Sequence, residues 1–531
     1  MNAVRKQGIN PLICLDYPDP DVIRVDDTYY MVSTTMHFMP GCEILRSYDL
    51  VNWEHASYVY DVLDSTPAQK LEGEQNIYGK GMWAACLRYH KGTFYICFVA
   101  NDTKKTYLYS APSIEGPWKK DYIQGFYHDC SILFDDDDRV YIASGNKYIR
   151  LQELKADLSG PKEGGIDRII AKDEGHPGLG YEGTHFYKIN GKYYLFFIHS
   201  LREQWKRVEA CFVSSSLEGE FLGGDVLNDD MGYYNQGVAQ GGIVDTPDGK
   251  WYAVLFQDRG AVGRIPVLIP ISWENDYPVF GENGKIPAEF EIVSTRPDYQ
   301  YMPLVQSDDF KGGFIMDEGA KSDGRVTKQC AYDSFGFKSC WQFNHEPDLS
   351  LVKRDLKRGT VEITTDKLCK SLTQAKNILT QRMRFPACAG EVTVDASSLK
   401  EGDYAGICAL QGCYGMVAVT KEKGKTLLVM KNRLPDNSSL QAMEGGKEEI
   451  LQEIRELHTD KLKLKIEVEF EEMKDEAKYY FDTGKGWTQI GGSHKLYFRL
   501  DHFTGCRFGL FIYGTKEIGG SVRFSEFVYR N

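Results

Sequence analysis

The feature that most constrains this sequence is a hairpin motif that recurs in its first half. Each copy has an acidic or glycine-containing turn followed by an aromatic-rich strand. The copies are Asp26–Tyr30, Lys91–Tyr95, Asp137–Tyr141, Gly191–Tyr194 and Gly249–Tyr252. Repeats of roughly 50 residues with paired strands are typical of β-propeller blades, whose corresponding positions face one axis. The motif therefore predicts an all-β fold that begins with a five-bladed β-propeller.

One position ahead of each hairpin carries residues that a strand does not need. Twelve positions before the last Tyr of four copies stand Trp83, Asp129, Glu182 and Gln240. In the first copy, where the hairpin is one residue shorter, Asp19 stands eleven positions before its Tyr. Turn-capping acids on unrelated hairpins would have no reason to keep such an offset. We therefore expect these five side chains to meet in one pocket.

Three of the five are carboxylic acids, and a pair of carboxyl groups across a cleft is what glycosidic bond cleavage requires. Glu182 has the longer arm and is assigned as the proton donor. Asp19 lies between Pro18 and Pro20, which restrict its backbone, and is assigned as the base. Asp129 would orient the donor and raise its affinity for the proton by like-charge proximity. Residue types alone leave this assignment open.

Five further residues are candidates for substrate contact, each with a structural alternative. Trp83 is either a stacking platform for a sugar ring or a core indole. His37 and Phe38 follow the first hairpin and would wall the cleft, although a structural His is the commoner outcome. Gln240 shares the position of the acids. Arg264 lies in a glycine-rich bend among apolar residues, where it needs a carboxylate or sugar hydroxyls as partner unless it is exposed.

The second half of the chain has a different texture. Residues 462–470 and 507–513 show the strand patterns of a two-sheet β-sandwich. We place the propeller at residues 1–297 and the sandwich at residues 298–531, separated by a proline-punctuated linker. The segment 341–348 is too polar and aromatic for a simple strand, so we expect a loop that reaches the propeller.

Composition excludes several classes of function. The net charge of −13 argues against nucleic acid and anionic membranes as partners. No apolar run has the length of a membrane span. The 13 cysteines are odd in number and form no Cys-x-x-Cys pair, which favours buried free thiols in a reducing compartment. The first residues lack the apolar core of a signal peptide, so we expect a cytoplasmic protein, or a secreted or periplasmic one if a leader has been removed.

Taken together, the motifs resemble those of glycoside hydrolase family 43, specifically its two-domain β-xylosidases and α-L-arabinofuranosidases. The segments that carry the resemblance are 10–25, 128–137, 181–188, 263–274, 341–348, 399–406 and 515–520. The resemblance implies a concanavalin-like sandwich and an inverting, exo-acting hydrolase. Such an enzyme would release terminal α-L-arabinofuranose or β-D-xylose from (arabino)xylan or its oligosaccharides. It also implies Asp19 as general base, Asp129 as pKa modulator, Glu182 as general acid and Arg264 as a substrate contact.

Three departures from the family pattern bear on cofactor and specificity. Gln240 stands where many relatives carry a His that can hold a metal or water on the propeller axis. We therefore expect no required cofactor and no metal ligands, and an axial calcium ion is in doubt. Cys130 stands where many relatives have Pro. Met36 and Phe38 differ from the aromatic pair of well-known xylosidases, which leaves the preferred pentose open.

Alternative functions remain beside the leading one. A non-catalytic carbohydrate-binding protein on the same scaffold would be expected to lose at least one acid, yet all three are present. An endo-acting arabinanase or xylanase is a further alternative. A retaining fructan hydrolase is disfavoured because the sequence has neither an Asn-Asp-Pro nor an Arg-Asp-Pro motif. The oligomeric state is left open.

Overall fold

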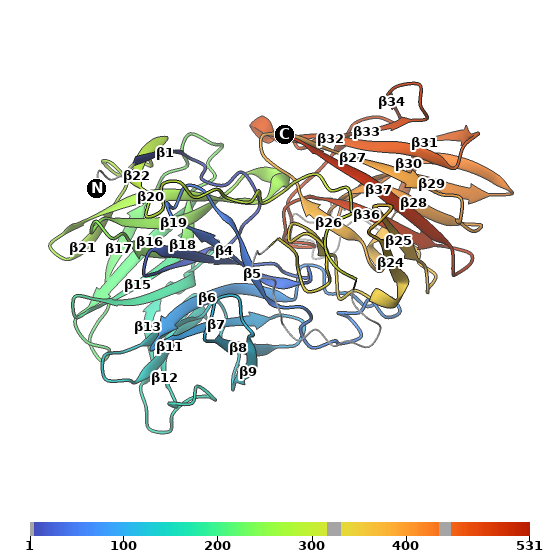
Figure 1. Cartoon of the computed structure of the whole chain (residues 1–531). Helices are drawn as coiled ribbons and strands as arrows, with labels where there is room; N and C mark the ends of the chain where they lie inside the picture. The colour runs from blue at the N-terminus through green and yellow to red at the C-terminus, as the bar shows by residue number, and fades with distance from the viewer. Residues whose placement is uncertain (1–4, 316–330, 435–447) are drawn as a thin grey trace.

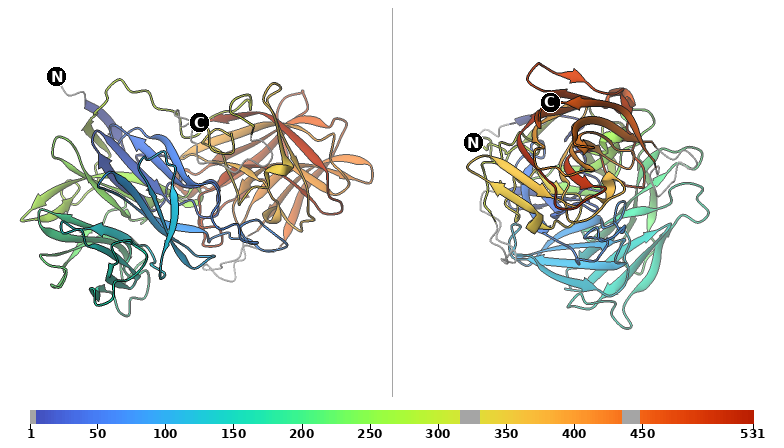
Figure 2. Two further views of the ribbon diagram at one scale, coloured as in Figure 1. Left: turned by 60° about the horizontal axis from the view of Figure 1, so that its bottom comes forward. Right: turned by 90° about the vertical axis from the view of Figure 1, so that its right-hand side faces the viewer.

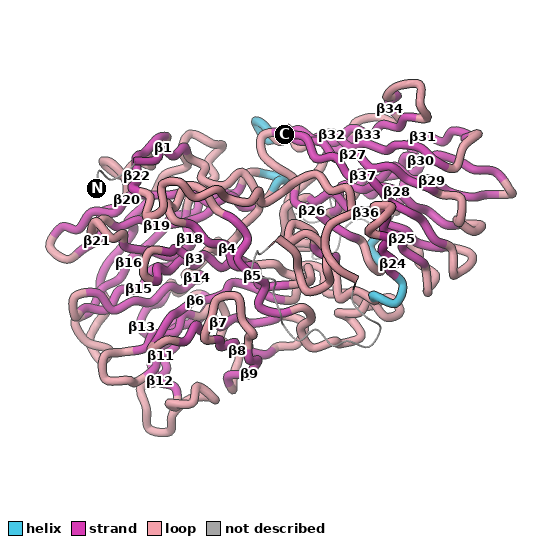
Figure 3. Tube along the Cα trace, viewed as in Figure 1, coloured by secondary structure: helices cyan, strands magenta, loops and turns pink. Residues whose placement is uncertain are grey.

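The computed structural model describes residues 5–315, 331–434 and 448–531. The chain forms two bodies, a propeller coloured blue to green and a sandwich coloured yellow to red (Figure 1). Apart from four short 3-10 helices, the described residues form strands, turns and loops (Figure 3). The predicted all-β fold, a five-bladed propeller followed by a β-sandwich, is confirmed.

Each propeller blade is an antiparallel sheet of four strands in consecutive order. The first two blades are β2 (Asp21–Val25), β3 (Thr28–Ser33), β4 (Gly41–Ser47) and β5 (Glu54–Tyr60), and β6 (Met82–His90), β7 (Thr93–Ala100), β8 (Lys105–Ala111) and β9 (Lys119–Ile123). The third is β10 (Ser131–Phe134), β11 (Val140–Asn146), β12 (Tyr148–Leu154) and β13 (Asp167–Lys172). The last two are β14 (Glu182–Ile189), β15 (Lys192–Ser200), β16 (Arg207–Ser214) and β17 (Leu222–Leu227), and β18 (Ala239–Asp245), β19 (Trp251–Asp258), β20 (Arg264–Glu274) and β21 (Tyr277–Phe280). Outside the ring, β1 (Arg5–Ile9) pairs with β22 (Glu289–Val293).

The first strand of each blade is the innermost, and the ring closes where β18 meets β2. The Gly242 amide donates a hydrogen bond to the Pro20 carbonyl over 2.9 Å, and Arg24 forms an ion pair with Asp245. Blades packed on both sides bury both faces of their middle strands. This burial explains the apolar and aromatic runs of the repeat. In β15, for example, every residue from Tyr193 to Ile198 is buried.

The repeated spacing of twelve residues is produced by hairpins of two lengths. In the fourth blade Tyr194 pairs with Tyr187 across the two-residue turn Asn190–Gly191. Both turn residues have positive φ, 49° and 78°, as a type I′ turn requires. In the third blade Tyr141 pairs with Leu133, one residue further back, because the connecting loop is longer. Equal spacing in sequence therefore does not mean equal position in the sheet.

Counted from the strand pairing, one position is shared by Asp19, Asp129, Gln240 and, in the fourth blade, Gly183. The φ angles there are 52°, 46°, 58° and 66°, all in the left-handed region. Trp83 and Glu182 each stand one residue earlier. The expectation of five identical positions is wrong in this detail, although all five residues lie within two residues of the start of an innermost strand.

The sandwich consists of two antiparallel sheets. The first contains, in spatial order, β23 (Gln342–Phe343), β26 (Leu379–Arg382), β36 (Arg507–Gly514), β28 (Asp403–Leu410), β29 (Gly415–Glu422), β30 (Lys425–Arg433) and β31 (Glu449–Leu457). The second contains β24 (Val352–Asp355), β25 (Thr360–Thr364), β37 (Ser521–Arg530), β27 (Ala387–Asp395), β32 (Lys461–Glu469), β33 (Glu476–Asp482) and β34 (Thr488–Gln489), with β35 (His494–Lys495) also on β33. In β32, Leu462, Leu464, Ile466 and Val468 are buried while their neighbours are not, as strand alternation predicts.

The sandwich lies over one end of the propeller ring (Figure 2, right). Part of the segment 341–348 is strand β23, which pairs with β26, and not the expected loop. Its expected contact with the propeller is present: Gln342 Nε2 donates to the Pro40 carbonyl over 2.6 Å, and the Phe343 amide to the Met39 carbonyl over 2.7 Å. The predicted boundary at residues 297/298 lies between β22 and β23 and stays a prediction.

Two further sequence observations can be compared with the structure. The 12 cysteines among the described residues are free thiols, and all except Cys14 are buried. Within the same residues, none of the helices is long and apolar enough to cross a membrane.

Candidate active site

The three predicted acids lie where the innermost strands begin. Asp19 and Asp129 stand two residues before β2 and β10, and Glu182 is the first residue of β14. Because the blades of a propeller repeat in orientation, these strand starts face one end of the ring. Asp19 and Asp129 hold left-handed φ angles of 52° and 46°. Backbone strain of this kind is concentrated at functional sites.

Asp19 is a buried carboxylate with both oxygens in use. The Thr34 hydroxyl donates to Oδ2 over 2.7 Å, and the Arg264 guanidinium donates to Oδ1 over 2.7 Å. The exposed fraction of Asp19 is 6% and that of Arg264 is 3%. A buried charge of each sign, paired and hydrogen-bonded, is the arrangement in which neither needs to be neutralised. Arg264 therefore balances the charge of the buried Asp19 carboxylate and fixes its orientation together with Thr34.

Asp129 is buried beside two other acids. Its Oδ2 accepts from the Gly183 amide over 3.1 Å and lies 3.5 Å from His128 Nε2. Burial raises the pKa of Asp129, and the charges of Glu182 and Asp19 raise it further, to about 7, although His128 opposes the shift. One oxygen of Asp129 lies within 4.8 Å of one of Glu182. Two carboxyl groups this close titrate as a pair, so the pair retains a proton in the neutral range.

Glu182 is the half-buried member of the pair. Its Oε2 accepts a hydrogen bond from the Asn146 side-chain amide and lies 3.5 Å from His128 Nε2. Burial disfavours the charged His128, but Asp129 and Glu182 outweigh it and raise the pKa of His128 to about 9. His128 is thus an imidazolium between two acids. It limits the negative charge of the pair without removing the shared proton.

A cavity of about 900 Å³ lies between the two domains; Glu182 lines it, whereas Asp19 and Asp129 do not. This is near the upper end of the range for small-molecule sites, roughly 300–1,000 Å³. Its propeller wall includes Trp83, His128, Asn146, Glu182, Arg207, Gln240 and Arg264. The Trp83 indole nitrogen is buried without a hydrogen-bond partner among the described residues. It is a donor available to a ligand in the cavity.

The opposite wall comes from the sandwich, chiefly from the segment 495–503, which follows β35. The Phe503 ring lies 4.4 Å from the Arg264 guanidinium and 5.6 Å from the Trp83 ring, and its carbonyl accepts from Arg264 over 3.4 Å. Asp475 also lines the cavity and accepts from the Ala261 amide over 3.0 Å. The sandwich therefore converts an open end of the propeller into a walled cavity.

Comparison with known proteins matches each half of the chain to a family model. Residues 9–278 match "Glycosyl hydrolases family 43", and residues 331–530 match "Beta xylosidase C-terminal Concanavalin A-like domain". The chain belongs to glycoside hydrolase family 43. The enzyme is therefore a glycosidase, and its two domains correspond to the two matches.

Several relatives of this family 43 enzyme are known. A solved structure described as a bifunctional GH43-CE protein of Bacteroides eggerthii is 39% identical, with a TM-score of 0.86. The match covers 99% of this chain but 64% of that one, so the relative is substantially longer. A β-xylosidase of Formosa agariphila is 25% identical over 98% of this chain and 90% of its own. A non-reducing end α-L-arabinofuranosidase of Bacteroides ovatus is 27% identical over 58% of this chain and 60% of its own.

The predicted substrate contacts of the family 43 enzyme divide into two groups. Trp83, Gln240 and Arg264 line the cavity, whereas His37 and Phe38 do not. His37 and Phe38 are 0% and 1% exposed. His37 packs in an aromatic cluster with Tyr78, His345 and His502 at the domain interface, and Phe38 lies 3.4 Å from the Arg507 guanidinium. Sequence position beside a hairpin does not reveal that the sandwich covers these two residues, so their expected place in the cleft wall is corrected.

Other residues of the site were not predicted from the sequence. His128 stands beside Asp129 in sequence, so its adjacency was visible. Asn146, at the end of β11, and Arg207, at the start of β16, carry no motif that could have indicated them. The 495–503 segment is aromatic-rich, but only the docked sandwich shows that it faces the acids.

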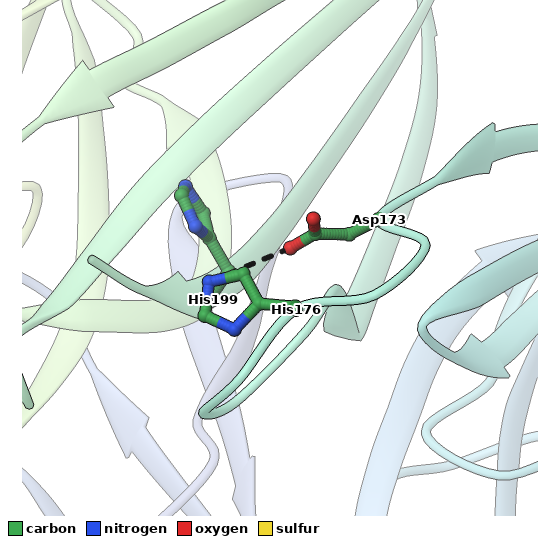
Figure 4. Close-up of side chains that lie close together, drawn as sticks. All are labelled: Asp173, His176 and His199. Carbon is green, nitrogen blue, oxygen red and sulfur yellow. Dashed lines mark ion pairs between the residues drawn. The ribbon is translucent and has the colours of Figure 1, made fainter. Parts of the chain in front are cut away.

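Among the described residues, two groups of side chains have ligand types that could hold a metal, namely His128 with Asp129 and Glu182, and Asp173 with His176 and His199. In the first, His128 Nε2 lies 3.5 Å from a carboxylate oxygen of each acid. In the second, Asp173 and His176 come from the loop after β13, and His199 from β15 (Figure 4). His176 Nδ1 accepts from the Gly178 amide over 3.0 Å and Nε2 faces the Ser200 carbonyl at 2.9 Å, so both ring nitrogens are occupied. The second group therefore does not fit a metal, and family 43 enzymes generally need no cofactor.

Proposed function

We propose that this protein is an inverting, exo-acting glycosidase that releases a terminal pentose, β-D-xylose or α-L-arabinofuranose, from (arabino)xylan oligosaccharides. The observation that carries the proposal is the arrangement of the three acids around the inner end of the ring, with Glu182 in the cavity lining. Asp19 is paired with the Arg264 guanidinium, while burial and the neighbouring carboxylates keep a proton on the Asp129–Glu182 pair in the neutral range. Glycoside hydrolysis by inversion needs one ionised and one protonated carboxyl group.

Glu182 acts as the general acid. It is the member of the pair that lines the cavity, whereas Asp129 is 6% exposed and is bound by the Gly183 amide. The proton passes from Glu182 Oε to the leaving glycosidic oxygen as the glycosidic bond breaks. Asp129 is assigned a positioning role, because it and Glu182 share His128, whose Nε2 lies 3.5 Å from a carboxylate oxygen of each.

Asp19 acts as the general base. Its carboxylate takes a proton from a water molecule, and the water oxygen attacks the anomeric carbon on the face opposite the leaving group. Thr34 and Arg264 fix the orientation of the carboxylate through one hydrogen bond to each oxygen. An inverting pair is separated by roughly 6.5–9.5 Å, which leaves room for the water.

The walls of the cavity support the exo mode and the sugar class. The 495–503 segment of the sandwich closes one side of the cavity, and a closed site favours a chain end over a continuous polymer. Trp83 offers a ring for stacking and an indole N–H for a hydroxyl. Relatives named as a β-xylosidase and as a non-reducing end α-L-arabinofuranosidase support a terminal pentose.

The proposal is tested with an aryl β-D-xyloside and an aryl α-L-arabinofuranoside assayed side by side. Wild-type enzyme is expected to hydrolyse at least one of them. Glu182→Gln and Asp19→Asn should each lose about 10²–10⁴-fold in kcat, the usual contribution of general acid–base catalysis. Glu163→Gln, an exposed carboxylate of the third blade, is the control and should stay active. Full activity in both site variants, or tight sugar binding without turnover in wild type, contradicts the proposal.

Stereochemistry and mode of attack need separate measurements. Proton NMR of the first-formed sugar should show the anomer opposite to that of the substrate. Product analysis on a xylo-oligosaccharide series should show a single pentose released at each step. Retention of configuration would contradict the inverting mechanism, and internal cleavage would identify an endo-acting enzyme instead.

A further inference from the structure

A buried ion pair, Asp21 with Arg88, links the innermost strands beneath the acids. Asp21 begins β2, and Arg88 lies in β6. Arg88 Nη1 donates to Asp21 Oδ2 over 2.7 Å. The exposed fractions of the two residues are 0% and 9%. A buried pair of this kind must satisfy its remaining hydrogen-bonding groups to be stable.

The guanidinium of Arg88 reaches two further blades. Its Nη2 donates to the Ser131 hydroxyl over 2.6 Å, and its Nε to the Ile132 carbonyl over 2.9 Å, both in β10. Nη2 also approaches the Phe186 carbonyl of β14 at 3.5 Å. One planar cation thus connects the first four innermost strands, which suits the several fixed donors of an arginine.

The carboxylate of Asp21 completes the connection to the fifth strand. Its Oδ1 lies 3.1 Å from His185 Nδ1 and 3.4 Å from the Tyr187 hydroxyl, both in β14. The Tyr187 hydroxyl accepts from the Ile243 amide of β18 over 3.1 Å. All five innermost strands therefore share one network, which places the ion pair on the axis of the ring.

Three groups whose oxygens could ligate a metal on this axis accept hydrogen bonds from Arg88. Calcium takes roughly 6–8 oxygen ligands. The Asp21 carboxylate, the Ser131 hydroxyl and the Ile132 carbonyl each accept a guanidinium N–H instead. The axis of this chain is occupied by an organic cation whose charge one carboxylate balances, and it does not fit a calcium ion.

We propose that the Asp21–Arg88 pair is a built-in axial cation site that positions the three acids of the active centre. Each acid lies close in sequence to a partner of the pair. Asp19 is two residues before Asp21, Asp129 is two residues before Ser131, and Glu182 is three residues before His185. A shift of the guanidinium would therefore displace all three carboxyl groups together.

Electrostatics agree with this geometry. Burial raises the pKa of Asp21, but Arg88 and His185 outweigh it and hold the pKa at about 2. Burial opposes the charge of Arg88, yet Asp21 raises the pKa of Arg88 above its ordinary value. The pair stays charged on both sides and nearly neutral in sum. A divalent ion in its place would add two positive charges near Asp129 and favour loss of the shared proton.

The test compares Arg88→Met, Arg88→Lys and a control, Arg46→Met, using the aryl pentoside on which wild type is active. Arg46 forms a largely buried ion pair with Glu54 over 2.6 Å, on the outer strands of the first blade. We expect both Arg88 variants to lose about 100-fold in kcat with KM changed little, since misplaced catalytic groups cost rate of this order. Arg46→Met should lose stability but keep kcat. Unchanged kcat in both Arg88 variants would overturn the proposal.

A second readout, Tm, is independent of substrate and of the proposed function. In Arg88→Ala, millimolar guanidinium chloride should raise Tm, whereas the Tm of wild type should not rise. The same addition should also restore part of the activity of Arg88→Ala. Ser131→Ala removes one of the bonds and serves if Arg88→Ala does not fold; it should lower kcat by several-fold and lower Tm less than Arg88→Ala does, because Ser131 also accepts from the Phe186 amide. A chelator should leave wild-type Tm and kcat unchanged. Loss of activity with the chelator, or no response of Arg88→Ala to guanidinium, contradicts an axial cation site.

Discussion

Asp21 and Asp129 are both buried carboxylates at the centre of one propeller, yet their neighbours move their pKa values in opposite directions. Burial raises the pKa of each. At Asp21 the cation of Arg88 and the imidazole of His185 reverse the effect, to about 2. At Asp129 two further carboxylates add to it, to about 7, against the opposition of His128.

The difference separates a structural site from a chemical one. Asp21 is fully hydrogen-bonded and charge-balanced, so it has nothing left to exchange with a ligand. The cluster around Asp129 and Glu182 keeps a transferable proton and borders a cavity. Perturbed pKa values in a cleft are a recognised sign of function. Burial raises the pKa of both carboxylates, but a cation offsets the effect at Asp21, whereas the raised pKa persists at Asp129. We propose that this raised pKa serves catalysis.

Asp129→Asn is the variant with the largest expected effect, and that effect is on catalysis. Removing this neighbour should lower kcat by about 10²-fold or more. Because the repulsion between two close carboxylates that helps to raise the pKa of Asp129 to about 7 is lost, the alkaline limb of the pH–rate profile should move to lower pH. The measurement is kcat/KM against pH, with exposed Asp137→Asn as control. An unshifted alkaline limb would remove Asp129 from its role as modulator.

Asp21→Asn should cause the largest loss of stability. It leaves the buried Arg88 unpaired, which costs about 3–5 kcal/mol in the free energy of unfolding. In wild type the folded pKa of Asp21 is depressed, so its stabilisation is present above its unfolded value of 3.8 and is lost as pH falls toward about 2. Urea unfolding at pH 7 and pH 3 measures both. A stability equal to that of wild type at pH 7 would mean that the axial pair contributes nothing.

Asp129→Asn should change the free energy of unfolding in the opposite direction to Asp21→Asn. The folded pKa is raised from 3.8 to about 7, so ionisation of Asp129 destabilises the fold as pH rises through this window. A shift of about three units corresponds to about 4 kcal/mol at most. The variant should therefore gain stability over wild type at pH 8 and little at pH 4. A loss of stability at pH 8 would show that the carboxylate is structurally required.

The smallest expected effect is that of Phe503→Ala. The hydrogen-bond partners of Asp21 and Arg88 given above all lie in the propeller, whereas the acid site is walled by the sandwich. Losing the Phe503 ring over Arg264 should raise KM about 5- to 30-fold, equivalent to about 1–2 kcal/mol. Exposed Ile518→Ala on a distant sandwich loop is the control. An unchanged KM would argue that the sandwich does not shape the substrate site.

Much of the site was predictable because the repeat encodes it locally. The hairpin turns reveal themselves through Asn-Gly and Lys-Gly, since only certain residues tolerate their positive φ angles. The repeats then place Asp19, Asp129 and Glu182 at one end of a ring. The equal spacing was partly a coincidence of turn length, and pairing shows Glu182 one residue away from the place of the other two.

The other errors and omissions lie where distant segments meet. His37 and Phe38 were expected in the cleft wall but are covered by the sandwich. Phe503 and Arg207 line the cavity, but they belong to segments with no recognisable motif. The pairing of Asp21 with Arg88 was not foreseen either, because the two residues belong to different blades.

By itself, the sequence determined the fold class and the number of blades, and it predicted the three acids, because strand alternation, turn chemistry and repeats act over a few tens of residues. Only the tertiary structure decided which groups are charged, what fills the axis and which surface closes the cavity. Those outcomes depend on burial and on charges brought together from far along the chain, and neither is written in local sequence.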